Sequence, residues 1–189
     1  MHPLSHKLAA IALSSFALAL PGTASAWDMT GTRTVALHTR DGQAIPIGTV
    51  TFQPQGDRTG FTLHLDEKPF KDFFLSMKEF KCLEGSEEIL CHVPYPYANP
   101  ATVTQNDLSW LEHALLFLYK TPAEFGARLW NGLYYRMRIT DEGIVGTAES
   151  VDLNLIAAPP AEASVAPFVP AERTEIAPDS RWIGRLTIR

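Results

Sequence analysis

Apolar and polar residues alternate with a period of two across residues 32–93, and this pattern limits the possible folds more than any other feature of the chain. Phe61, Leu63 and Leu65, for example, share one parity, and polar residues occupy the positions between them. Such alternation is typical of strands with one buried face. Asp41-Gly42 is a dipeptide that favours a tight hairpin turn. We therefore predict consecutive antiparallel strands over this part of the chain.

The alternation changes phase within residues 73–83, where Phe73 and Phe80 fall on opposite parities although both are expected to face the core. One extra residue in a strand turns all the following side chains to the other face. We therefore predict a single strand with a β-bulge near Lys78-Glu79.

Two cysteines, Cys82 and Cys91, enclose eight residues. A turn centred on Ser86-Glu87 would place them opposite each other on a hairpin, where the separation of the side chains suits a disulfide. The spacing is not that of a C-x-x-C redox or metal motif, and the chain has no further cysteine. We predict a structural disulfide between Cys82 and Cys91.

Leucines recur at helical spacing after Thr104, at positions 108, 111, 115 and 118. Thr104 and Asp107 have the spacing of a capping box, although Asp is a poorer partner than Glu. We predict a helix that begins at Thr104 and carries this stripe. Thr121-Pro122 is a second signal for a helix start, and it predicts a short helix to about Trp130.

Strand patterns return in residues 134–139, 144–155 and 185–189, and five of the 14 prolines lie between Pro159 and Pro178. We expect a Pro-rich, irregular arm at about residues 157–180. Strands, then helices, then strands indicate an α+β fold that is mainly antiparallel β, with one or two helices inserted between strands. Such a meander forms either a curved open sheet or a small barrel, and the pattern does not choose between them.

The N-terminal 26 residues have the pattern of a secretory signal peptide. Lys7 precedes an apolar run over residues 8–20, and small residues lead to a cleavage site between Ala26 and Trp27. The run is too short to span a bilayer, which takes about 20 residues. We expect a single β-rich domain over residues 27–189, periplasmic or secreted from a Gram-negative bacterium, with no transmembrane segment.

Cleavage there would change the formal net charge from −5 to −6, because it removes one lysine and no acid. An acidic domain is not expected to bind nucleic acid or an anionic membrane surface.

The sequence offers few candidates for chemistry. Glu112 and Asp152 are carboxylates that would serve acid–base catalysis only if a second titratable group lay beside them. Glu112 and His113 are adjacent in the predicted helix and are expected to point about 100° apart, so they should not share a site. His64 and Asp66 share one strand face, but a zinc site needs a third ligand. We therefore assign no catalytic residue, no metal and no cofactor.

Aromatic residues in and beside the helical middle of the chain are the main candidates for ligand contacts. Tyr and Trp combine apolar area with a hydrogen-bonding group, which suits sugars, lipids and peptides alike. These rings either pack the helices onto the sheet or form a binding surface. The candidates are Tyr95, Tyr97, Trp110, Trp130 and Tyr134, with Tyr135 beside them.

Four blocks of the chain resemble a family of exported proteobacterial proteins that has no assigned activity. The resemblance implies export and a paired disulfide, and it implies no catalytic role. The strand order is also similar to that of a lipocalin-type meander, which is an analogy of fold and does not fix a function. The blocks are Phe74-Leu75-Ser76-Met77, Phe80-Lys81-Cys82, Cys91-His92-Val93-Pro94-Tyr95-Pro96-Tyr97 and Leu129-Trp130-Asn131-Gly132-Leu133-Tyr134-Tyr135.

Three functions are compatible with these features. The first is a periplasmic binding or envelope-accessory protein that holds an apolar or amphipathic ligand near the helix and the Pro94–Tyr97 loop. The second is a hydrolase of envelope material that uses a carboxylate. The third is a factor that docks another envelope protein through the Pro-rich arm.

Overall fold

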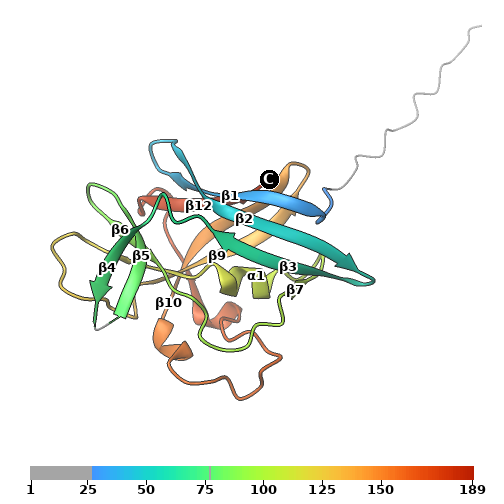
Figure 1. Ribbon diagram of the computed structural model, residues 1–189. Helices are drawn as coiled ribbons and strands as arrows, with labels where there is room; N and C mark the ends of the chain where they lie inside the picture. Colours follow the sequence, from blue (N-terminus) through green and yellow to red (C-terminus); the bar gives the residue numbers. More distant parts are fainter. Residues whose placement is uncertain (1–26, 77) are drawn as a thin grey trace, which may run out of the picture.

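The computed structural model describes residues 27–76 and 78–189 (Figure 1). The predicted signal peptide, with its cleavage site after Ala26, lies outside the described residues. Within them, twelve strands form one sheet, accompanied by a short helix α1 (Ser109–Ala114) and two 3₁₀ turns, η1 (Leu153–Ile156) and η2 (Pro170–Glu172). The strands are β1 (Gly31–Thr39), β2 (Ala44–Gln55), β3 (Arg58–Leu65), β4 (Lys71–Leu75), β5 (Lys78–Glu84), β6 (Ile89–His92), β7 (Thr102–Val103), β8 (Phe117–Lys120), β9 (Gly132–Thr140), β10 (Gly143–Val151), β11 (Arg173–Glu175) and β12 (Ile183–Ile188).

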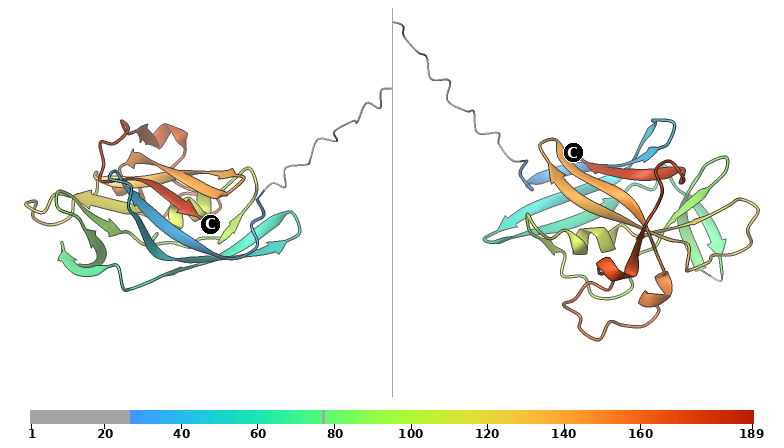
Figure 2. Two further views of the ribbon diagram at one scale, coloured as in Figure 1. Left: turned by 90° about the horizontal axis from the view of Figure 1, so that it is seen from above. Right: turned by 180° about the vertical axis from the view of Figure 1, so that it is seen from behind.

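All strand pairs are antiparallel, and the order across the sheet is β4-β5-β6-β8-β9-β10-β12-β1-β2-β3-β7. β11 pairs with the end of β10, beyond the part of β10 that pairs with β12. The sheet is curved and does not close (Figures 1 and 2). The predicted α+β meander is therefore confirmed, and it takes the open form of the two that the pattern allowed.

The hydrophobic core has two parts, which lie on opposite faces of the central strands. In β9, Leu133 and Tyr135 belong to one part and Tyr134 belongs to the other, and all three are buried. The first part fills the concave side against β1–β3. The second part is covered by η1 and by Phe168 of the Pro-rich arm. The first half of β9, Gly132 to Tyr135, is thus buried on both faces, and it carries no charged residue.

The phase change in residues 73–83 is a hairpin and not the predicted bulge. β4 pairs with β5 from Lys71↔Cys82 to Leu75↔Lys78, so the chain reverses direction between these strands. Phe73 lies opposite Phe80 across the pair. Residues that face each other in this register have opposite parities, so a reversal produces the same pattern as an inserted residue. The prediction of a single bulged strand was wrong for that reason.

The predicted helix from Thr104 to Leu118 is mostly a different structure. Only Ser109–Ala114 is α-helical, Thr104 forms an isolated bridge with Asp107, and Leu118 lies in β8. Residues 115–118 are all apolar and fully buried. Such a run is compatible both with the buried face of a helix and with a strand that is buried on both faces. Spacing alone could not separate the two.

The second predicted helix, from Thr121 to about Trp130, does not form. Its first turn is present, because the Glu124 N–H donates to the Thr121 carbonyl and the Glu124 carboxylate accepts from the Thr121 N–H at 2.7 Å. Gly126 then adopts a φ of +72°, a left-handed conformation that ends a helical path. The segment continues as an irregular loop to β9.

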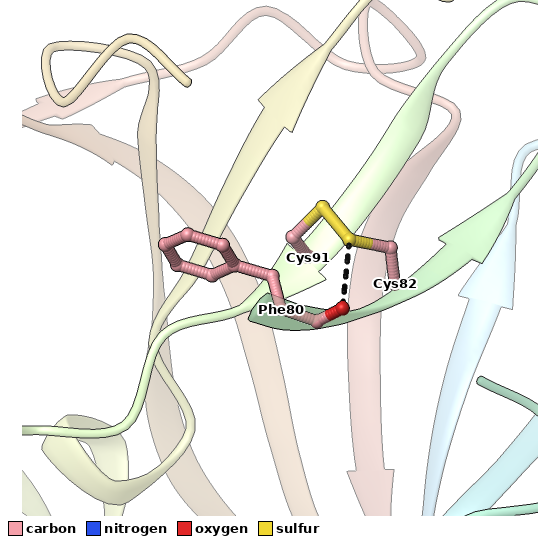
Figure 3. The surroundings of a disulfide bond; sticks show 3 residues. All are labelled: Phe80, Cys82 and Cys91. Carbon is pink, nitrogen blue, oxygen red and sulfur yellow. Dashed lines mark hydrogen bonds between the residues drawn. A yellow bond between two sulfur atoms is a disulfide. The ribbon is translucent and has the colours of Figure 1, made fainter. Parts of the chain in front are cut away.

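The predicted disulfide is present and its hairpin has the expected register. Cys82 pairs with Cys91 across β5 and β6, and the two sulfurs are bonded (Figure 3). The Gly85 N–H donates to the Glu88 carbonyl at 2.9 Å, which closes the turn around Ser86-Glu87. Both cysteines are fully buried in the second part of the core.

Residues 157–180 form an extended arm that leaves η1 and returns along β10 as β11 (Figure 2). Phe168 is the buried residue of this arm, with 2 % of its surface exposed. Among the described residues, no helix has the length and apolar character needed to cross a bilayer.

We predict that replacing both cysteines by alanine, Cys82→Ala with Cys91→Ala, lowers the free energy of unfolding by about 2.5–3 kcal/mol. A disulfide that closes a ten-residue loop restricts the unfolded chain by about this amount. Urea titration of the wild type and the double variant measures the difference. Reductant should weaken the wild type and leave the double variant unchanged, and equal stabilities under oxidising conditions would contradict the prediction.

Candidate functional site

A cavity of about 460 Å³ lies between α1, β9 and the Pro-rich arm. Trp110, Tyr134 and Phe168 line it from below and are themselves buried, and the arm adds the exposed apolar residues Val165 and Val169. Four ionisable side chains also line it, namely Asp107, Glu112, Arg136 and Arg173. The cavity therefore joins an apolar surface to charged groups.

Glu112 reaches the cavity because α1 takes the place of a missing strand. β8 pairs with β9 only at Phe117↔Leu133 and Leu118↔Gly132, so the remainder of β9 has no strand on that side. The Met137 N–H, which would otherwise be left without an acceptor, donates to Glu112 Oε1 at 2.6 Å. Tyr134 Oη donates to Glu112 Oε2. The carboxylate of Glu112 thus completes the hydrogen bonding of a buried sheet edge.

Burial changes the proton affinity of this pair. It raises the pKa of Glu112, against the opposing effects of the Met137 N–H, the Tyr134 hydroxyl and the Arg173 charge. Burial likewise raises the pKa of Tyr134, and the neighbouring Glu112 charge adds to the shift.

His113 connects the helix to the arm. Its Nε2 accepts the Phe168 N–H at 3.1 Å, so the proton is on Nδ1, which donates to the Ser109 carbonyl at 2.7 Å. The imidazole stacks on the Phe168 ring, with 5.3 Å between centroids. Burial lowers the pKa of His113 to about 4, and the Arg173 charge contributes in the same direction.

Arg173 is the most buried cation of the site, with 12 % of its side chain exposed. Its guanidinium lies over the Tyr134 ring at 4.9 Å from the centroid. The nearest ion-pair partner is Glu149, at 3.5 Å, and Glu149 is already bonded by Arg136 Nε at 2.6 Å. Among residues 27–76 and 78–189, no acceptor bonds the buried Nε of Arg173.

Of the aromatic candidates, Trp110 and Tyr134 line the cavity and the others do not. Tyr95 lies behind Trp110 and His113, with ring centroids 6.0 and 5.7 Å away, and Tyr97 packs edge-on against Tyr95. The Pro94–Tyr97 loop therefore supports the helix, and the arm forms the wall that we expected this loop to provide. Trp130 is 59 % exposed on the loop before β9, and Tyr135 belongs to the concave part of the core.

The two carboxylate candidates lie in different places. Glu112 lines the cavity, whereas Asp152 is exposed and caps η1 by accepting the Asn154 N–H at 2.9 Å. Glu112 and His113 leave α1 in different directions, and of the two only Glu112 lines the cavity, although Tyr134 contacts both. Its hydroxyl bonds Glu112, and its ring lies 5.4 Å from the His113 ring. In the described part of the chain, no three His, Cys, Asp or Glu side chains gather in a way that could hold a metal ion.

The cavity is also lined by three residues that were not predicted from the sequence, namely Arg136, Arg173 and Phe168. Arg136 could have been found, because it shares the parity of Tyr134 along β9. Arg173 and Phe168 belong to the arm, whose irregular path gives no periodic signal, so only the fold brings them to β9. Comparison of the chain with protein-family models, with curated proteins and with solved structures finds no match.

We predict that Glu112→Leu lowers the free energy of unfolding by about 2–4 kcal/mol, because it leaves the Met137 N–H and the Tyr134 hydroxyl buried without a partner. Glu112→Gln should cost less, since the amide can accept from Met137 and donate to Tyr134. Denaturant titration measures both. Glu162→Leu, at an exposed position of the arm, is the control. Equal stability of Glu112→Leu and the wild type would contradict the role of Glu112 at the sheet edge.

We predict that His113 makes the domain less stable as the pH falls from 6.5 to about 4. Over this range the unfolded chain binds a proton at His113 that the folded chain excludes, so folding loses up to about 3 kcal/mol. Unfolding free energies of the wild type and His113→Gln, measured across this range, should differ in slope with that sign. Because burial also lowers the pKa of His38 and of His92, the comparison between variants is needed.

The matched control for this measurement is His64→Gln, which changes an exposed histidine on β3 and should keep the slope of the wild type. Hydrogen exchange of the Phe168 amide gives a second measure, since protonation of His113 Nε2 removes its acceptor. A wild-type slope in His113→Gln would show that His113 does not carry the effect.

Proposed function

We propose that this chain is an exported binding protein that holds a small amphipathic molecule in the cavity between α1, β9 and the arm. The observation that carries the proposal is that apolar and charged side chains line one cavity of about 460 Å³. Ligand sites typically combine an apolar, aromatic lining with a few polar groups that orient the ligand. A volume of this size suits a molecule of one to three rings or a short acyl chain.

Export is the second element of the proposal, and two features support it. The first is the signal-peptide pattern that precedes Trp27. The second is the Cys82–Cys91 disulfide, which is typical of oxidising compartments such as the periplasm.

A hydrolase has less support from the geometry. Glycosidases and related acid–base enzymes use two titratable groups in one cleft. Asp152 caps η1 away from the cavity, and both oxygens of Glu112 are engaged by Met137 and Tyr134. Asp107, the other carboxylate of the cavity lining, is exposed and accepts the Ser109 N–H at 3.0 Å at the start of α1.

A docking role for the arm also has less support. The arm supplies Phe168 to the core and β11 to the sheet, so a large part of it is committed to the fold. We therefore expect deletion of the arm to lower the free energy of unfolding, whereas deletion of an arm that served only to dock a partner would leave it unchanged.

We predict that the neutral dye N-phenyl-1-naphthylamine binds the domain at one saturable site, and that Ser164→Trp weakens binding at least about tenfold. Ser164 lines the cavity from the exposed side of the arm, so a large ring there occupies the space of the ligand. Dye fluorescence measures the affinity of each variant.

Ala163→Trp is the matched control, because it adds the same ring one residue earlier, at an exposed position outside the cavity lining. Wild-type affinity in Ala163→Trp and loss in Ser164→Trp would support the cavity as the site. Equal affinities in the two variants would place the dye elsewhere and overturn the proposal. If the cavity is supported as the site, native mass spectrometry of the protein purified from its own periplasm would identify the natural ligand.

A further inference from the structure

We infer that the molecule bound in this cavity carries an anionic group, a carboxylate or a chemically similar oxyanion, and that Arg173 binds it. The inference rests on the proposed function and adds the chemical class of the ligand. Its basis is the environment of Arg173, a nearly buried cation at the cavity wall whose ion pairing is incomplete.

Two arginines share one carboxylate beside the cavity. Arg136 Nε bonds Glu149 Oε1 at 2.6 Å, whereas Arg173 lies 3.5 Å from Glu149 Oε2. Charge-assisted hydrogen bonds between guanidinium and carboxylate are normally about 2.7–2.9 Å long. Glu149 therefore neutralises one of the two cations well, and the group of three carries an excess positive charge at Arg173.

A second arginine of the same domain lies closer to both its tyrosine ring and its carboxylate. Arg181 stacks on Tyr119 at 4.1 Å from the ring centroid and lies 3.1 Å from the buried carboxylate of Glu88. Arg173 has the same kind of surroundings, a tyrosine ring and a buried glutamate, but both separations are longer, at 4.9 and 3.5 Å. Its Nε also has no acceptor within the described residues, but this nitrogen is shielded from solvent, so a bound anion would have to meet the terminal nitrogens of the guanidinium. A buried guanidinium left in this state is costly unless another anion completes it.

Two acids also line the cavity, and neither supplies that anion. Asp107 is exposed, and its Oδ1 accepts the Ser109 N–H at 3.0 Å at the start of α1. Glu112 uses both oxygens for Met137 and Tyr134.

The rest of the lining defines the body of the ligand. Trp110, Tyr134 and Phe168 line the cavity but are themselves buried, so they form its apolar floor and leave little ring surface for stacking. The arm adds two exposed apolar side chains, Val165 and Val169. The structure therefore favours a small apolar molecule with one anionic group at the Arg173 end.

The test compares three naphthalene probes of nearly equal shape, measured by calorimetry with the full domain at neutral pH. They are 2-naphthoate, 2-naphthamide and 2-naphthylmethylammonium, which are anionic, neutral and cationic. We expect 2-naphthoate to bind at least about tenfold more tightly than 2-naphthamide, and the cation to bind most weakly. In Arg173→Met, the anion and the amide should bind about equally.

Arg138→Met is the matched control, because Arg138 is exposed on β9 and does not line the cavity. It should keep the preference for the anion. A wild type that binds the amide or the ammonium ion as tightly as 2-naphthoate would overturn the inference and leave the proposed function standing. Binding of none of the probes would count against both. A full anion preference in Arg173→Met would overturn the role of Arg173, and the wild-type comparison decides the ligand class even if that variant does not fold.

Discussion

The bond between the Glu112 carboxylate and the Met137 N–H is the interaction on which the rest of the site depends. β8 pairs with only the first two residues of β9, so the following residues of β9 have no strand beside them on that edge. This unpaired edge is nevertheless buried. A buried N–H without an acceptor costs about as much as a lost hydrogen bond. The side chain of Glu112 supplies the acceptor that a neighbouring strand would otherwise provide, and this contact holds α1 against β9. The cavity is the space between α1, β9 and the arm.

The arm completes the arrangement from the other direction. It leaves the sheet at η1, covers the outer face of β9 with Phe168 and rejoins β10 as β11. Arg173, at the start of β11, is carried in this way to the Tyr134 ring. Arg173 and Tyr134, about 40 positions apart in the sequence, thus lie side by side in the cavity wall. They meet because the arm covers the second face of β9. A sheet with one solvated face would have no need of such a cover.

The sequence predicted the parts of the fold that repeat and missed the parts that depend on long-range contacts. Period-two alternation predicted the antiparallel strands, and the Cys82–Cys91 spacing predicted the register of their hairpin, because both signals are local. The helix predicted from Thr104 was too long, because residues 115–118 are apolar and fully buried. An apolar run of that kind is compatible with a helix and with a strand that is buried on both faces. Trp110, Glu112 and Tyr134 could be named as candidates from residue type alone. Arg173 could not, because its importance comes from which carboxylate it reaches, and no local pattern encodes that distance.

The adjacent pair Glu112 and His113 shows how a very short helix can organise a site. Six helical residues are far too few to be stable on their own in water. The two side chains leave α1 in different directions, one to the edge of β9 and the other to the backbone of the arm. Tyr134 meets both, through its hydroxyl and its ring. The helix is therefore held by the same contacts that shape the cavity wall.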